Sequence, residues 1–387
     1  MRQALFALFA SVLAFPAAIP AACAAPGAEA EAETPQGRLD WTIEADPKQR
    51  AKGDVQLALS RRTASSTWLH SNTRPLAGLI GLTAAQLGSE SGNPVSFVLD
   101  REAGAFVCEG TARRWQGSGR CVFHANAGFA SELADRGYGR PSESQHFSLA
   151  LYGIGRSFID ELGRQGYARP TIEDLARAGS HGADLDYLKA MGGHGYRVGN
   201  LAALIAMRDH GVTPDYVAGL ARLGIADLSA DQVVKLRDHG VTPDFVSAFR
   251  SAGYSLPIDQ LIRLRDHGVT PDYVRKLDGL GVKGVPADQL VELRDHGVSA
   301  EFVGEAARLG YRFATRDLIG LRDQGVTSDY LAELKTLGYS GLPAADIVRL
   351  RSHGVDSDFI RRVNASGGSR RTAAELVSLR SGGWAER

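Results

Sequence analysis

The chain of 387 residues has little of what usually carries catalysis. It contains three cysteines and ten histidines, and it has no HExxH, GxSxG or P-loop motif. Those motifs supply, respectively, a metal site, a serine nucleophile and a phosphate cradle. No cysteine stands in a setting that would make it a nucleophile. These absences favour a non-enzymatic protein, and we expect no cofactor.

An excess of charge of one sign is lacking as well. Lys and Arg together number 44, and Asp and Glu also number 44, so the formal net charge is +0. Nucleic acids and anionic lipid surfaces are bound mainly through clustered Lys and Arg. The composition therefore argues against a nucleic-acid partner, and the protein partner that we expect is indicated by the repeats described below. Contact with a membrane is expected only if Cys23 carries a lipid.

Long apolar runs are missing except at the start of the chain. Arg2 precedes an apolar stretch, residues 4–19, which is followed by small residues. A stretch this short with an Ala-x-Ala pattern is typical of a secretory signal, so we predict a signal peptide at 1–24 and export to the periplasm or cell exterior. The alternative is a lipoprotein anchored at Cys23, although Pro20 replaces the usual aliphatic residue. Residues 25–38 are predicted to be a flexible leader.

Removal of the signal would leave two cysteines in an oxidising compartment. Cys108 and Cys121 lie in alternating apolar stretches separated by a glycine-containing turn, as in a β-hairpin. A turn centred between Arg114 and Trp115 would place the two cysteines opposite each other. We therefore predict a disulfide, with a metal or redox site as the weaker alternative, because no CxxC or neighbouring His pair is present.

Residues 39–127 are predicted to form a small β-rich domain. Short segments within it alternate apolar and polar residues as strands do; they are 41–44, 55–59, 95–99, 105–108 and 121–124. A short helix is expected within 76–87. About five strands would make a small antiparallel sheet or open barrel. No linker follows the last strand, so we expect this domain to cap the helical region.

Glycine, in contrast, is abundant and periodic. Of the 45 glycines, one set recurs every 28 or 29 residues from Gly137 to Gly367. An aromatic residue stands eight positions before each member of the set: Phe129, Phe158, Tyr187, Tyr216, Phe245, Tyr273, Phe302, Tyr330 and Phe359. A fixed period in this range is typical of a solenoid of stacked supersecondary units. The aromatic residues are predicted to be core rather than a ligand-stacking surface.

A second set of glycines, in the phrase LRDHGV or its variants, divides each unit into two helices. In the unit 229–253, Ser229 and Gln232 form a capping box, and Gly240 ends the first helix. Thr242 caps the second helix, which has Pro243 at its first position. The distance from this second glycine to the next glycine of the first set is always 13 residues. We predict an α+β, mainly α protein with about eight helix-turn-helix repeats in 128–387.

The histidines of the repeats invite a catalytic or metal-binding interpretation, because most follow an aspartate. The residues concerned are His210, His239, His267, His296 and His353. They recur in successive units, whereas an active site is needed once, and stacking would hold them about 10 Å apart, too far to share a metal. We therefore interpret them as helix-terminating residues that hydrogen-bond to the neighbouring unit. In the β-rich domain, Trp68 and Trp115 form a possible ligand face.

The segments HGVTPDYV, FVLDREAGAFVCEG and GSGRCVFHANAGF carry a family resemblance. The chain resembles a group of exported bacterial repeat proteins, and similar repeats occur in extracytoplasmic tails of some membrane metallopeptidases related to beta-lactam sensors. The zinc motif of those peptidases is missing here. The resemblance therefore implies sensing or binding outside the cytoplasm and transfers no catalytic residue.

Three hypotheses for function follow, in order of preference. The first is an extracytoplasmic protein-interaction or structural scaffold. The second is a small-ligand or glycan binding module that uses the β-rich domain near Trp68 and Trp115. The third is a metal-dependent hydrolase that uses the Asp-His pairs.

Overall fold

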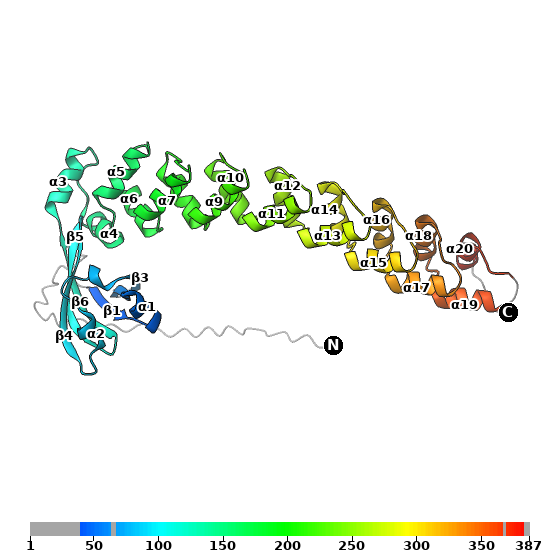
Figure 1. Ribbon diagram of the computed structural model, residues 1–387, viewed down its shortest axis with the longest axis horizontal. Helices are drawn as coiled ribbons and strands as arrows, with labels where there is room; N and C mark the ends of the chain where they lie inside the picture. The colour runs from blue at the N-terminus through cyan, green and yellow to red at the C-terminus, as the bar shows by residue number, and fades with distance from the viewer. Residues whose placement is uncertain (1–38, 63–66, 367–368, 383–387) are drawn as a thin grey trace, which may run out of the picture.

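The computed structural model describes residues 39–62, 67–366 and 369–382. The predicted signal peptide, the leader and Cys23 lie outside these residues. Figure 1 shows a β-sheet at one end of the molecule and a long, gently curved array of short helices extending from it. The predicted fold class, a mainly α protein with a sheet followed by a helical solenoid, is confirmed.

The sheet has six antiparallel strands in the order β3-β2-β1-β6-β5-β4. The strands are β1 Leu39–Glu44, β2 Asp54–Arg62, β3 Thr67–Pro75, β4 Asn93–Arg101, β5 Gly104–Arg113 and β6 Gln116–Ala125. Sequence analysis expected about five strands and missed β3. Inward-facing positions of β3 hold His70 and Arg74, so the strand lacks the apolar alternation that marks its neighbours. The helix expected within 76–87 is a 3-10 turn, Leu76–Gly78, and a short helix, α2, Ala84–Gly88.

The two edges of the sheet approach each other, as in an open barrel. The chain leaves β3 at Pro75, and five residues later Ile80 exchanges two backbone hydrogen bonds with Val98 of β4, at 2.9 and 2.8 Å. Trp41, Phe97 and Phe106 fill the interior, with at most 2% of each side chain exposed. The outward face of the strands carries mostly polar residues.

The hairpin of β5 and β6 has the predicted geometry. Arg114 and Trp115 both adopt left-handed backbone angles, with φ of 49° and 66°, as a two-residue hairpin turn requires. Cys108 is paired with Cys121 in the strand register, and the two form a disulfide. The predicted disulfide is therefore confirmed.

Helix α4, Glu143–Tyr152, connects the sheet to the solenoid. Its Phe147 packs edge-on against Phe106 and Phe123 of the sheet, with ring centroids 5.7 and 5.4 Å apart. The same helix also packs against α6, Ile172–Ser180. The buried residues of sheet and helices form one continuous hydrophobic core.

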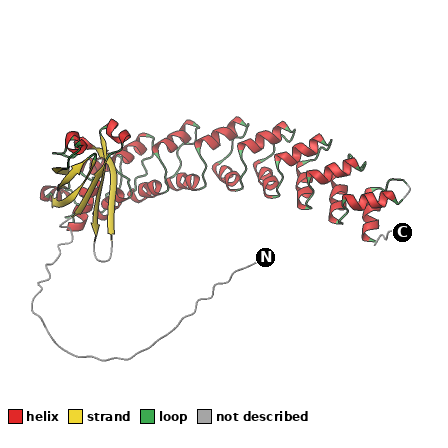
Figure 2. Ribbon diagram, turned by 90° about the horizontal axis from the view of Figure 1, so that it is seen from below, coloured by secondary structure: helices red, strands yellow, loops and turns green. Residues whose placement is uncertain are grey.

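The rest of the described chain is helical. Besides α1, Pro47–Lys52, the remaining helices are α3 Ala127–Asp135, α5 Arg156–Arg164, α7 Leu185–Gly193, α8 Leu201–Asp209, α9 Pro214–Arg222, α10 Ala230–Asp238, α11 Pro243–Ser251, α12 Ile258–Asp266, α13 Pro271–Gly279, α14 Ala287–Asp295, α15 Ala300–Arg308, α16 Thr315–Asp323, α17 Ser328–Thr336, α18 Ala344–Ser352, α19 Ser357–Ala365 and α20 Ala373–Ser381. From α4 onward most even-numbered helices pack on the next even-numbered helix, and from α5 onward each odd-numbered helix packs on the next odd-numbered one. The result is a two-layer rod, which Figure 2 shows from below.

The local signals read from the sequence produce these helices. Ser229 and Gln232 make the predicted capping box at α10, and Gly240 ends that helix with a left-handed φ of 67°. Thr242 accepts a hydrogen bond from the backbone N–H of Phe245 at the start of α11. Helices of nine residues are marginal alone, so their stability comes from packing against neighbouring units.

Candidate partner-binding groove

The repeated aromatic residues are core. All nine, from Phe129 to Phe359, are buried with at most 7% of the residue surface exposed. They line the interface between successive units and leave no ladder of exposed rings. Their predicted role as core is confirmed.

Seven of these nine rings also receive the repeated arginine of the next unit. The arginine of the LRDHGV phrase, or of its variant, lies over the ring, with the guanidinium carbon 4.9 to 5.5 Å from the ring centroid. The pairs are Arg208 with Tyr187, Arg237 with Tyr216, Arg265 with Phe245, Arg294 with Tyr273, Arg322 with Phe302, Arg351 with Tyr330 and Arg380 with Phe359. Sequence analysis missed this cation–π contact, although its constant spacing is visible in the repeat.

Where the repeated aromatic is tyrosine, it makes a second contact across the interface. The hydroxyls of Tyr216, Tyr273 and Tyr330 each donate to the carbonyl of the valine in the next HGV phrase, at 2.7 Å. Burial raises the pKa of each of these tyrosines to about 12. Each hydroxyl therefore keeps its proton and remains a hydrogen-bond donor near neutral pH.

The repeated histidines bond to the neighbouring unit, but the acid is not the one that precedes them in sequence. Each Nδ1 lies 2.5 to 2.8 Å from a carboxylate of the following unit. The pairs are His181 with Asp209, His210 with Asp238, His239 with Asp266, His267 with Asp295 and His296 with Asp323. His353 instead meets the hydroxyl of Ser381 at 3.2 Å. The repeated arginine, histidine and aromatic residues thus join one unit to the next.

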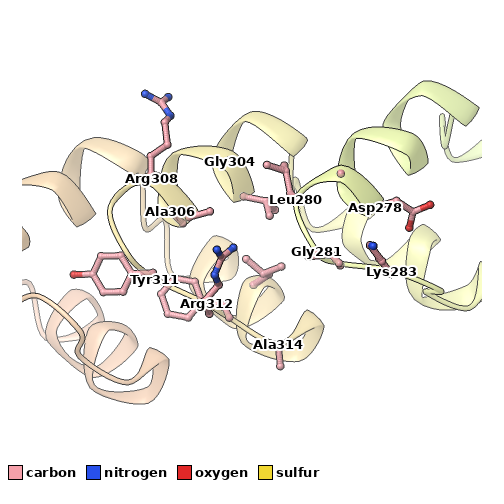
Figure 3. Close-up of a pocket in the computed structure, with 16 residues that line it drawn as sticks. Asp278, Leu280, Gly281, Lys283, Gly304, Ala306, Arg308, Tyr311, Arg312 and Ala314 are labelled. Atoms are coloured by element: carbon pink, nitrogen blue, oxygen red, sulfur yellow. The ribbon is translucent and has the colours of Figure 1, made fainter.

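A groove interrupts this uniform array between α13 and α15. Its volume is about 920 Å³. Figure 3 shows Leu280 and Lys283 on the α13 side, and Gly304, Arg308, Tyr311 and Arg312 on the other. Phe313, stacked on Tyr311 with ring centroids 5.3 Å apart, also lines it. The groove therefore spans two successive units.

Missing side chains open this groove. A Cβ on Gly279 or Gly281 would have no heavy atom within 4 Å, and one on Gly304 would first meet Leu280 at 3.5 Å. Sequence analysis missed the groove, and the extra glycines around 279–284 are the signal that could have found it.

The groove has an apolar floor and a positively charged rim. Leu280, Val282 and Phe313 are half-buried in it. Lys283 and Arg312 are exposed at the rim, where Asp278 is the opposing charge. Arg308 also lies there and is paired with Glu305 of its own helix. Such a surface suits a segment that has both apolar and acidic side chains.

The two tryptophans proposed as a ligand face lie at opposite ends of the sheet. Trp68 of β3 is paired with Arg61 of β2 and packs against Phe147 of α4. Trp115 lies in the β5–β6 turn beside Gly88. In the strand register, the row of the sheet that holds Trp68 and the turn that holds Trp115 are separated by about five residues along the strands, or roughly 17 Å. Trp68 and Trp115 therefore do not form one ligand face, because Trp68 is taken up by contacts with α4.

Comparison with known proteins adds no assignment. No protein-family model matches the chain, and no curated protein sequence matches it. The resemblance to exported bacterial repeat proteins therefore stays a prediction.

Among the described residues, no group of three or more His, Cys, Asp or Glu side chains is arranged to hold a metal ion. Within the same part of the chain, none of the helices has the length and apolar character needed to cross a bilayer.

Proposed function

We propose that the protein is an extracytoplasmic, non-enzymatic scaffold that holds a protein partner on its solenoid, with the groove between α13 and α15 as the docking site. The observation that carries this proposal is the groove itself. Elsewhere in the solenoid the repeated side chains contact the neighbouring unit, whereas the groove leaves a space between two units. The disulfide of the sheet is compatible with export.

The occupant we propose is an extended or helical segment of a protein that carries an apolar side chain flanked by acidic residues. The apolar side chain would lie on Leu280, Val282 and Phe313. The acidic residues would face Lys283 and Arg312, whose side chains are exposed at the rim. Opposite charges around an apolar centre give specificity as well as a faster association rate.

Site-specific photo-crosslinking tests the proposal. A photoreactive residue at position 312 is compared with one at position 250, an exposed arginine at the end of α11, outside the groove. We expect one protein to crosslink from position 312 and not from position 250 in cells that make the tagged protein. Equal crosslinking from both positions would contradict a docking site in the groove.

Filling the groove gives the matched test with the purified partner. Gly304→Leu adds a side chain on α15 where the nearest atoms are those of Leu280, so we expect the fold to persist and the affinity to fall at least tenfold. Arg312→Glu should weaken binding and remove most of its salt dependence. Arg250→Glu is the control for charge reversal and should leave affinity unchanged. If all three variants bind equally, the groove is not the docking site.

One observation favours a second function, binding of a polar small ligand or glycan by the sheet. The outer face forms a hollow of about 710 Å³ lined by hydroxyl and amide groups, including those of Thr42, Gln56, Ser71, Thr111 and Ser118. A thermal-shift screen against periplasmic metabolites and glycans tests this alternative. A positive ligand should lose its effect in Thr111→Val, and a uniformly flat screen would contradict it.

A further inference from the structure

Two arginines from opposite edges of the sheet lie near the end of α4, close enough for the charge of Arg101 to act on Arg74. Arg74, near the end of β3, is buried, with 8% of its surface exposed. Arg101 ends β4 and is half-buried. The contact between Ile80 and Val98 brings these two edges together, and α4 ends next to them at Gly153.

Neither guanidinium has its hydrogen bonds satisfied. Arg74 donates Nε and Nη2 to the same oxygen, Oδ1 of Asn72, at 3.1 and 2.7 Å, and its buried Nη1 has no partner. The Nε of Arg101 is likewise buried without a partner. Among the described residues, no carboxylate lies within the 4.0 Å of an ion pair with either side chain. Nη1 of Arg74 and Nε of Arg101 are thus two buried hydrogen-bond donors without an acceptor.

The electrostatics of this place reflect uncompensated positive charge. Burial and, to a lesser extent, the charge of Arg101 together lower the pKa of Arg74 to about 10. Burial also lowers the pKa of Arg101, against the opposing effect of Asp100. His70, whose ring lies edge-on to Tyr152 at 5.1 Å, has its pKa lowered by burial and by Arg74. Burying like charges without a counter-charge is strongly unfavourable.

We propose that a small oxyanion, with carboxylate or phosphate chemistry, bridges Arg74 and Arg101 and joins the sheet to the first solenoid helices. One oxygen accepts from Nη1 of Arg74, and a second accepts from Nε of Arg101. Guanidinium groups suit oxyanions because the planar donors match the acceptor geometry. The anion supplies the counter-charge that the described part of the chain does not.

The surroundings leave room on the Arg101 side. Arg101 lines a cavity of about 240 Å³ together with Gly153, Gly155 and Ser157. Nε of Arg101 is buried there, and a Cβ at Gly153 would lie 3.9 Å from it, so the end of α4 packs close to that edge of the guanidinium. Asp100 and Glu102 also line the cavity; Asp100 is exposed, and the carboxylate of Glu102 accepts the backbone N–H of Arg156 at the start of α5. The negative charge of Glu102 therefore stabilises the N-terminus of α5.

Anion exchange at constant ionic strength tests the proposal with the full-length mature protein. Chloride is replaced stepwise by acetate, by phosphate or by sulfate while thermal unfolding is followed. We expect a saturating rise of the midpoint with at least one oxyanion, on the order of 5 °C at a hundredfold excess over its dissociation constant. The acetate and phosphate arms decide between the two sources of oxyanion. A midpoint that does not respond to any of the three would overturn the proposal.

Variants separate a specific site from a general salt effect. Arg74→Met/Arg101→Met should abolish the saturating response, whereas Arg294→Met, which removes a guanidinium from the solenoid, should keep it. If the double variant does not fold, Arg74→Lys keeps the charge but changes the donor geometry, and calorimetric titration should show at least tenfold weaker binding. If the double variant responds as the wild type does, or is simply more stable in every salt, the buried cations have no bound partner.

Discussion

The sheet and the solenoid solve the problem of stability in different ways. In the sheet every contact is made once: Trp41 against Phe97, Cys108 to Cys121, Phe147 of α4 against Phe106. In the solenoid the same three contacts recur between units, through an arginine on a ring, a histidine on a carboxylate and, in some units, a tyrosine on a carbonyl. The solenoid can therefore lose one copy of a contact and keep the others, whereas the sheet has no second copy of the contact that it loses.

The solenoid itself shows this tolerance. Gln324 replaces the repeated histidine, and Phe245 and Phe302 replace the repeated tyrosine, without breaking the period of the helices. Each unit touches only its neighbours, so a lost contact is a local loss. The buried polar groups of the sheet, such as His70 and Arg74, have no equivalents to share their role.

The largest expected effect comes from removing a core aromatic in either region. Trp41→Ala and Phe249→Ala each delete a fully buried side chain and should lower the free energy of unfolding by about 3–5 kcal/mol. Hydrogen exchange should rise across all six strands in the first variant, but only in α9 to α13 in the second. The exposed Leu69→Ala is the control and should have no effect beyond about 0.5 kcal/mol. Exchange that spreads along the whole solenoid in Phe249→Ala would break the comparison.

The disulfide gives the next largest effect. The cysteines are 13 residues apart, and closing a loop of that size restricts the unfolded chain by about 3 kcal/mol. Cys108→Ala/Cys121→Ala should therefore destabilise the sheet by this amount in urea unfolding followed by near-ultraviolet circular dichroism. The helical signal of the solenoid should be nearly unchanged. An equal shift of both signals would show that the two regions unfold as one.

A smaller effect is expected from one tyrosine hydroxyl. Tyr273→Phe removes a donor to the carbonyl of Val298 and should lower the free energy of unfolding by about 1 kcal/mol. Phe245→Tyr makes the reverse change in the preceding unit, where we expect no loss and up to a similar gain. Chemical denaturation of both variants measures the difference. Identical stabilities would mean that the hydroxyl contributes nothing across the interface.

The smallest expected effect is on pH dependence, and its sign should differ between the regions. The hydrogen bond to Asp323 raises the pKa of His296, so its stabilisation is present below the unfolded pKa near 6.5 and is lost as pH rises through the folded pKa. Burial lowers the pKa of His70 and His146, so their stabilisation is present above 6.5 and is lost as pH falls through the folded values.

Acidification from pH 7.5 to 5.5 should therefore increase hydrogen exchange in the sheet and slightly decrease it near α14 to α16. His296→Asn should remove the second change and leave the first. The same response of both regions to pH would contradict opposite shifts of these histidines.

The solenoid could be predicted from sequence because its determinants are local. Ser229 and Gln232 cap a helix through residues three apart, and Gly240 ends it through its own backbone freedom. The hairpin was predictable for the same reason, since a two-residue turn sets the register that brings Cys108 opposite Cys121. β3 was not predictable, because its inward residues His70 and Arg74 are polar and conceal the alternation.

The candidate site was hidden because it is made by residues that share no local pattern. The groove joins the end of α13 to the turn after α15, and it exists where Gly279 and Gly304 leave space. No short-range rule relates Lys283 to Arg312 across 28 intervening residues, yet stacking of two units places both at one rim.

By itself, the sequence determined the period, the caps, the turns and the paired cysteines, because backbone preferences and short-range hydrogen bonds act within a few residues. The tertiary structure decided which aspartate each histidine meets, that arginines lie on the aromatic rings, and that Arg74 and Arg101 share one buried place. Those contacts depend on how one unit is set against the next and how the sheet edges meet. Such geometry comes from packing, and packing joins residues that are distant along the chain.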